Sequence, residues 1–346
     1  MGASKSKKSN TNSYLLKALQ LREMAIVIAI VIVFVLAFIK NSSFASTASI
    51  QQLLSGPSVV ILLAVGETLV IITRNVDLSI GSILGLSAYV VGDLFVHHPQ
   101  MPILLALLAG TGVGLVCGLI NGLIVAYAKV PALVVTLGML YIIRGVDALL
   151  VNGRQIVPSS IPNSFINLGA NSIIGIPILT WIAGIAVLVF TYIMRTFRPA
   201  RDFYAIGSNT EAAVLAGVRV QRRIFTAFLI SGSLAGLGGA LWLAEFATVG
   251  STAGSGYELN VIAAVVVGGV AIFGGSGTVL GAAFGALLLN TIDQALVASR
   301  VSSFWNQAVA GALLLVAIAF DRYISIRTER ALRVDRHLSS QGELNG

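Results

Sequence analysis

Long apolar segments separated by short polar ones make up most of the chain. A membrane-spanning helix needs about 20 predominantly apolar residues, and ten segments come close to this length. Their approximate limits are 24–40, 54–73, 79–96, 102–128, 131–151, 173–194, 223–246, 259–273, 278–297 and 303–320. The pattern predicts an all-α integral membrane protein with about ten transmembrane helices.

Polar segments flank this predicted membrane domain, which extends over residues 24–320. Residues 1–23 are rich in Lys and Ser and are expected to form a disordered cytoplasmic segment. The first apolar run lacks a small-residue cleavage site, so we expect it to remain as a span. Residues 321–346 are expected to form a polar cytoplasmic tail.

The composition excludes a water-soluble protein. The chain of 346 residues is 56% hydrophobic and 10% charged, with a mean hydropathy of +0.92, whereas soluble domains are about 25% charged. A net charge of +8 could indicate nucleic-acid binding. The basic residues, however, lie between the spans and are not interleaved with exposed aromatic residues, so no nucleic-acid partner is expected.

The basic residues are distributed unequally between the two sides of the predicted bundle. Of 22 Lys and Arg residues, 18 fall in the segments that are cytoplasmic if the N-terminus is inside, and three fall in the outer segments. Those three are Lys40, Arg154 and Arg300, while Arg144 lies within a span. The positive-inside rule therefore predicts cytoplasmic termini for a multi-pass protein.

A short helix is predicted at about residues 208–216, outside every apolar run. Ser208 and Glu211 have the spacing of a capping box, and Gly217 has the position of a C′ residue. Between them, Ala212 and Ala213 belong to a smooth alanine face that another surface could approach closely. A helix this short is marginal by itself, so we expect it to pack against a partner.

This segment resembles the coupling motif of bacterial ATP-binding-cassette (ABC) importer permeases, in which Glu-Ala-Ala is followed after three residues by Gly. Three further stretches, 75–82, 130–138 and 254–259 with 274–277 beyond it, resemble the permeases for ribose, simple sugars and autoinducer-2. The resemblance covers about residues 50–320. It implies that the residues coupling the chain to an ATPase are Gly207, Ser208, Asn209, Glu211, Ala212, Ala213 and Gly217.

The resemblance also implies the function and the partners. A permease of this kind forms the translocation pathway for a monosaccharide or related small polar solute in the bacterial inner membrane. Its partners are a cytosolic ABC ATPase, a periplasmic or lipid-anchored solute-binding protein, a second permease chain and membrane lipid. The sequence lacks the Gly-x-x-x-x-Gly-Lys-Ser/Thr phosphate-binding motif, so ATP hydrolysis is assigned to a separate subunit and no cofactor is expected.

Other functions remain open at this point. A related ABC permease could carry branched-chain amino acids or nucleosides. An ion-coupled secondary carrier is a second alternative, although such a carrier has no motor for the predicted coupling helix to engage. A membrane enzyme is a third, but His97, His98 and His337 are too scattered for a metal or catalytic cluster, and the lone Cys117 excludes an intramolecular disulfide.

Polar residues inside the apolar runs are candidates for the translocation pathway. An ionisable group at membrane depth costs about 2.5–3.5 kcal/mol on insertion scales, so it usually faces a cavity or a partner. Arg144 and Asp147 are three residues apart and are expected to pair. Glu67, Glu245 and Asp293 have no obvious local partner, and hydrogen bonding between helices is an equal alternative for them. The pathway candidates are Asp77, Ser79, Asn121, Thr136, Glu258 and Asn260, with Asn290 and Gln294 as further neutral groups.

Two segments share a pattern that suggests how the bundle is built. Residues 77–80 open the third span from the inside and residues 258–261 open the eighth from the outside. Each begins with an acidic residue, a leucine, a small polar residue and an aliphatic one. The pattern indicates either inverted-topology repeats, which place discontinuous helices near a central pathway, or coincidence.

Glycine recurs every four residues in two of the spans. Such stripes allow helix backbones to approach closely, so that dispersion can hold helices together in lipid. We expect packing to be their main role, with pore lining as the alternative. The two stripes are Gly110, Gly114, Gly118 and Gly122 in the fourth span, and Gly277, Gly281 and Gly285 in the ninth. Gly274, Gly275 and Gly277 also predict a tight turn between the eighth and ninth spans.

The charge asymmetry generates a test of topology. A reporter enzyme that is active only in the periplasm, fused to the C-terminus, is expected to be inactive, because both termini are predicted to be cytoplasmic. The same reporter inserted after Arg154 serves as the positive control. Reporter activity at the C-terminus would show that a span has been miscounted.

Overall fold

The computed structural model describes residues 7–301 and the separate positions 305, 308, 309, 311–313, 315, 316 and 319, with side chains from residue 23 onward. Within this part the chain is almost entirely helical, and eight helical segments are long and apolar enough to cross a membrane. The predicted all-α membrane fold is therefore confirmed. The expected tenth span is described only at isolated positions, and the expected tail, 321–346, lies outside the described residues.

The described helices fall into long membrane-spanning elements and short ones. In chain order they are α1 (Lys7–Lys40), α2 (Thr47–Ser55), α3 (Ser58–Ile72), α4 (Ile80–His97), α5 (Ile103–Ala126), α6 (Ala132–Val151), α7 (Asn163–Ala170), α8 (Ile178–Thr196), α9 (Arg198–Ser208), α10 (Thr210–Leu215), α11 (Val220–Phe246), α12 (Tyr257–Val267) and α13 (Val279–Ala298). The described elements also include two 3-10 turns, η1 (Ser42–Ala45) and η2 (Pro158–Ser160). An antiparallel hairpin is formed by β1 (Ser172–Ile173) and β2 (Ile176–Pro177).

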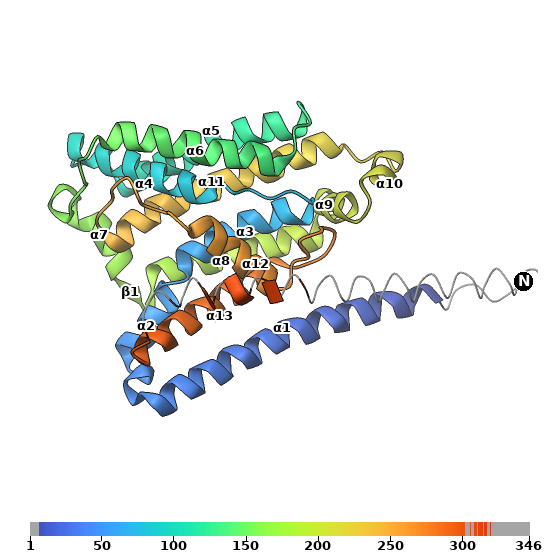
Figure 1. Ribbon diagram of the computed structural model, residues 1–346, viewed down its shortest axis with the longest axis horizontal. Coiled ribbons are helices and arrows are strands. Elements are labelled where there is room, and N and C mark those ends of the chain that lie inside the picture. Colours follow the sequence, from blue (N-terminus) through green and yellow to red (C-terminus); the bar gives the residue numbers. More distant parts are fainter. Residues whose placement is uncertain are drawn as a thin grey trace, which may run out of the picture.

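The helices form an elongated bundle whose two ends carry different short elements. Figure 1 shows α9 and α10 at one end, and α2, α7 and β1 at the other. We call these the α10 end and the α7 end. At the α7 end, the rings of Phe95 in α4 and Phe165 in α7 pack with their centroids 4.8 Å apart.

The interior of the bundle is built around α3. Every residue of α3 except Val60 is buried, as expected for a helix that is apolar on all sides. The first span has the opposite character, because α1 exposes most of its apolar side chains, with Leu36 61% and Ile39 75% exposed. Such a surface is stable only against lipid or another apolar partner.

A close helix contact joins α5 and α11 through glycine. A Cβ atom added at Gly114 would overlap the carbonyl oxygen of Gly232, and one added at Gly118 would overlap the carbonyl oxygen of Phe228. The two backbones therefore touch directly, which lets dispersion hold the pair together. The same contact includes Gly110 and Gly122 on α5 and Gly236 on α11.

The second glycine stripe only partly belongs to a helix. Gly281 and Gly285 of α13 lie against the backbone of α12 around Ala264 and Gly268. The assignment of Gly277 to this packing face is wrong, because α13 begins after the N-cap residue Thr278. Gly277 instead has φ +130° in the turn between the two helices, a conformation open mainly to glycine.

Three expected boundaries need correction. Residues 7–23 are not irregular, since α1 is continuous from Lys7 to Lys40. The sixth span begins at Ile178, because residues 172–177 form the β-hairpin. The eighth is only the 11-residue α12, and residues 268–278 leave the helical conformation at a glycine-rich stretch whose residues 274 and 275 have positive φ angles.

The helices α4 and α12 begin next to one another inside the bundle. Gly81 at the start of α4 is in contact with Gly254 and Glu258 at the start of α12. The two helices therefore start in the interior, because non-helical segments, residues 73–79 and 247–256, lead into it from the two ends. From this meeting point α4 runs to the α7 end and α12 to the α10 end.

The contact between α5 and α11 generates a prediction. Leucine at position 114 or 118 is expected to force the two backbones apart, and overpacking of this kind costs about 1–3 kcal/mol. Both variants should show a lower melting temperature in detergent and a lower yield. The matched control is Gly112→Leu on the same helix, where an added Cβ meets no atom within 4 Å. Equal stability of all three variants would contradict the packing role.

Candidate functional site

The short helix α10 begins at Asn209. The Asn209 side chain accepts a hydrogen bond of 3.0 Å from the backbone N–H of Ala212, which is the usual role of an N-cap residue. The prediction that Ser208 caps this helix with Glu211 is wrong by one residue. Ser208 is instead the last residue of α9, so its backbone is still helical and its side chain cannot take the N-cap position.

The other end of α10 is closed by Gly217. The N–H of Gly217 donates to the carbonyl of Val214 and the N–H of Val218 donates to that of Ala213, the paired bonds of a Schellman motif. Gly217 has φ +81°, so the structure places this glycine at the predicted C′ position. Both ends of the helix are therefore fixed by specific backbone conformations.

One face of α10 is buried and the other is bare. Ala213 is 4% exposed and packs in a small core with Ile206 of α9 and Val220 of α11. On the opposite side Val214 is 56% and Leu215 is 89% exposed. The neighbouring Glu211 and Ala212 are exposed as well. The helix thus presents a small apolar surface that no described part of the chain covers.

The end of α9 is tied to the end of α3. The Arg74 guanidinium donates to the carbonyl oxygens of Gly207 (2.6 Å) and Ser208 (3.0 Å). Gly207 is buried against the carbonyl of Ile72, where a Cβ atom would overlap it. Glycine at 207 is therefore required for the close approach. The Arg74 guanidinium supplies hydrogen-bond donors to the carbonyl groups that have no helical partner at the end of α9.

A second tie joins α9 to the turn after α12. The hydroxyl of Tyr204 donates to the carbonyl oxygen of Gly277 at 3.1 Å. Burial raises the pKa of Tyr204 to about 12, so the hydroxyl remains a proton donor at every physiological pH. An ion pair of 2.8 Å between Asp202 and Arg223 attaches α9 to α11 in addition.

Three of the predicted pathway residues, Asp77, Ser79 and Asn121, form a hydrogen-bonded cluster in the interior, and Thr136 lies beside it. Asp77, Ser79, Asn121 and Thr136 are each 0% exposed. The Asp77 carboxylate accepts from the N–H and the hydroxyl of Ser79, and the Asn121 amide donates to the same hydroxyl at 2.8 Å. The cluster lines neither of the cavities described below. Its members hold the non-helical segment 73–79 in place.

Two neighbours complete this cluster. Glu67 of α3 accepts a hydrogen bond of 3.0 Å from the backbone N–H of Asp77. Thr136 of α6 donates to the carbonyls of Val76 and Ala132. Buried backbone groups without helical partners are costly unless other groups satisfy them, so these side chains perform that task for the segment.

The remaining two pathway candidates lie at the start of α12. The Glu258 carboxylate accepts from the backbone N–H of Gly256 at 3.2 Å. Asn260 is exposed and borders a cavity of about 150 Å³. Asn290 and Asp293 of α13 border the same cavity, together with Tyr257. The structure therefore brings together Asn260, Asn290 and Asp293, which the sequence singled out separately.

The expected pair of Arg144 and Asp147 does not form. Arg144 instead donates a hydrogen bond to the carbonyl oxygen of Ala253, across from α6 to the non-helical segment 247–256. Both carboxylate oxygens of Asp147 are without a hydrogen-bond partner among the described residues. Arg144 therefore fixes the backbone of the second discontinuous segment, as the Asp77 cluster fixes the first.

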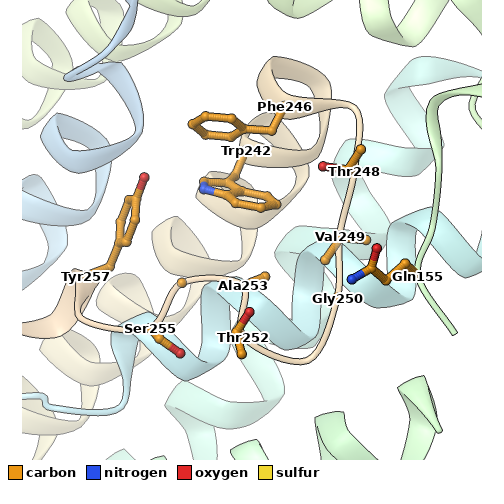
Figure 2. A pocket seen from close by; sticks show the side chains of 11 residues that line it. Gln155, Trp242, Phe246, Thr248, Val249, Gly250, Thr252, Ala253, Ser255 and Tyr257 are labelled. Carbon is orange, nitrogen blue, oxygen red and sulfur yellow. The ribbon is translucent and has the colours of Figure 1, made fainter. Parts of the chain in front are cut away.

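A larger cavity, of about 340 Å³, opens beside this segment. It lies between the end of α11 and the start of α12, with Gln155 on its far side (Figure 2). The sequence analysis did not identify most of these residues as functional. The side chains that line it belong to Gln155, Trp242, Phe246, Thr248, Val249, Thr252, Ala253, Ser255 and Tyr257.

These features describe a multi-pass membrane protein with buried polar side chains at its centre and an exposed, capped short helix at one end, the class to which permeases belong. Comparison with known proteins identifies the family. The chain belongs to the family described as branched-chain amino acid transport system / permease component, whose model matches residues 49–318.

Individual relatives are similar along most of their length. The chain is 35% identical over 316 residues to the autoinducer 2 import system permease protein LsrC of Escherichia coli (strain K12 / DH10B), covering 91% of each chain. The LsrC proteins of Shigella flexneri and Salmonella choleraesuis (strain SC-B67) show the same identity. No solved structure matches the chain. The protein is thus a transport subunit of the bacterial inner membrane and not an enzyme.

The tie between α3 and α9 is testable. Arg74→Ala is expected to lower the melting temperature, because two hydrogen bonds from a charged group are lost and two carbonyls remain unpaired. For a partly exposed group, the loss in the free energy of unfolding is about 1–2 kcal/mol. Arg222→Ala is the control, since Arg222 is exposed and no side-chain hydrogen bond is found for it among the described residues. Equal thermal unfolding of the two variants would show that the tie contributes nothing.

Proposed function

We propose that the chain forms the translocation pathway of an ABC importer for a monosaccharide-like solute, and that α10 docks the ATPase. The observation that carries this proposal is the bare face of α10. Glu211, Ala212, Val214 and Leu215 are exposed on a helix capped at both ends and backed by α9. A rigid helix with an unpartnered apolar face suits a cleft on another subunit.

We also infer the orientation of the protein. The α10 end carries Arg198, Arg201, Arg219, Arg222 and Arg223 near the ends of α8 and α11, whereas the loop between α6 and α7 carries only Arg154. The basic end is expected in the cytosol. The ATPase would then meet α10 there, and a periplasmic or lipid-anchored solute-binding protein would approach the α7 end. A second permease chain completes the implied assembly.

The contacts of α9 offer a way for the ATPase to act on the pathway. Arg74 connects α9 to the segment that leads into α4, and Tyr204 connects it to the segment that follows α12. A rigid displacement of α9 and α10 would therefore move segment 73–79 and the turn after α12 at once. Rigid-body movements of this kind are a common means of switching between two states.

The relatives favour a sugar-like solute over an amino acid. Their names assign them to autoinducer 2 import, while the family description names branched-chain amino acids, and the latter remain the second candidate. The two solutes differ in charge, since an amino acid is a zwitterion at neutral pH. The ligand held by the partner binding protein, identified by mass spectrometry after purification, discriminates between them.

Ala212→Trp tests the docking surface. The large side chain is expected to clash with the ATPase and to reduce its co-purification with the permease by at least about tenfold, because a misfit at the centre of an interface removes a large part of its binding energy. Membrane insertion should be unchanged. Ala170→Trp, an exposed alanine at the α7 end, is the control. If the Ala212→Trp variant retained the ATPase normally, α10 would not be the docking surface.

Gly217 allows a second test of the same helix. Gly217→Val is expected to weaken ATPase retention and uptake, because φ +81° is strained for a β-branched residue. Gly217→Asn should retain most of the function, since asparagine tolerates this conformation. No atom lies within 4 Å of an added Cβ at this position, so steric overlap within the chain is not involved. Equal behaviour of the two variants would contradict a role for the backbone conformation.

A further inference from the structure

The larger cavity has a shape and a position that suit a small molecule. Its volume of about 340 Å³ lies at the lower end of the range of about 300–1,000 Å³ for small-molecule sites. Gly254, at its edge, contacts Gly81 at the meeting point of α4 and α12. The segment that forms one wall is held by backbone hydrogen bonds between Ile156 and Val249. The cavity is thus formed by a fixed wall and lies directly beside the centre of the bundle.

The lining of the cavity is polar but uncharged. Gln155, Thr248, Thr252 and Ser255 contribute one amide and three hydroxyl groups, and none of the lining residues is acidic or basic. Trp242, Phe246 and Tyr257 contribute aromatic rings on the same side (Figure 2), with the first two packed at a centroid distance of 4.6 Å. Such a lining favours a neutral solute with hydroxyl groups. The lining offers no counter-ion for a zwitterion.

Trp242 and Tyr257 interact with one another in this lining. The indole N–H of Trp242 is buried and is turned towards the side chain of Tyr257, with which it interacts (Figure 2). Trp242 therefore helps to position the Tyr257 ring at the edge of the cavity. The polar groups that remain for a ligand are the amide of Gln155 and the hydroxyls of Thr248, Thr252 and Ser255.

We propose that this cavity binds the transported solute, a neutral polyhydroxylated molecule whose hydroxyl groups bind the amide of Gln155 and the hydroxyls of Thr248, Thr252 and Ser255. The inference rests on the proposed function as a permease and adds the place and the chemical class of the solute. The aromatic rings cover the apolar face of the solute, and the amide and hydroxyl side chains bind its edge. Charged solutes are excluded because their desolvation would be uncompensated.

Tyr257 connects this cavity with the smaller one. It lines both cavities, and the smaller one adds Asn260, Asn290 and Asp293. A solute leaving the larger cavity past the Tyr257 ring therefore reaches a second set of hydrogen-bonding groups. Two successive sites of this kind hold the solute weakly at each step, as transport requires.

Tryptophan fluorescence can test the binding site directly. The chain contains three tryptophans, Trp181, Trp242 and Trp305, so a variant with Trp181→Phe and Trp305→Phe reports on Trp242 alone. In the full-length purified chain, D-ribose or autoinducer-2 is expected to shift the Trp242 emission in a saturable manner. Thr252→Val combined with Ser255→Ala should weaken this binding about tenfold, because two hydrogen-bonding groups are lost. L-leucine, a zwitterion, should cause no saturable shift.

Uptake by the assembled importer provides the second measurement. Trp242→Phe retains an aromatic ring but removes the N–H that interacts with Tyr257 and helps to hold its ring at the edge of the cavity, and should reduce uptake about three- to tenfold at limiting solute. Its matched control is Trp181→Phe on α8, where the indole donates to the carbonyl of Ile173 instead. ATPase retention should be normal in both variants, so a failure of the docking proposal is recognised separately. The proposed solute site would be wrong if neither D-ribose nor autoinducer-2 changed the Trp242 emission, or if L-leucine shifted it equally. Equal uptake by the Trp242→Phe and Trp181→Phe variants would overturn it as well.

Discussion

The backbone of a membrane protein must satisfy its own hydrogen bonds, and the rest of this structure depends on how the chain meets that requirement at two places. Non-helical backbone is tolerated at membrane depth only where protein surrounds it or where it lines a cavity. Among the described residues, segments 73–79 and 247–256 are two non-helical stretches that lead into the bundle. Asp77 with its neighbours holds the first, and Arg144 holds the second. These side chains therefore support the two segments, and both cavities lie beside the second segment or the start of α12.

The meeting of α4 and α12 depends on glycine in the same way. Both helices start where the non-helical segments end, and Gly81 leaves room for Gly254 and Glu258. With any larger residue the two starts could not be neighbours. The N-termini of helices carry partial positive charge, and in transporters built from inverted repeats such termini surround the central pathway. The opposite directions of α4 and α12 agree with this arrangement, for which residues 77–80 and 258–261 gave the first indication.

The sequence predicted the features that arise locally and missed those that arise from distant segments. Hydropathy located the spans, and the four-residue spacing located the face of α5 that meets α11, because both patterns are periodic along one helix. Apolar length did not reveal that α12 ends at Val267, since hydropathy counts glycine-rich loops and helices alike. The sequence predicts Ser208 as the N-cap, whereas the structure has Asn209. The position of the N-cap depends on where α9 ends, and the close contacts of Gly207 determine that end. The cavity around Trp242 combines Gln155 with residues about one hundred positions later in the chain, and no local pattern marks such a site.

The distribution of polar contacts also indicates which parts can move. A membrane helix is held by its own hydrogen bonds along its whole length, so bending it exposes several backbone groups to lipid. A segment held by a few side chains can change position when only those contacts change. Segments held by a few side-chain contacts are expected to supply the moving elements of a bundle. Since α9 contacts segment 73–79 through Arg74 and the turn after α12 through Tyr204, a push applied at α10 would reach these connections without deforming the long helices. Force from an external subunit would therefore act on the connections between the long helices.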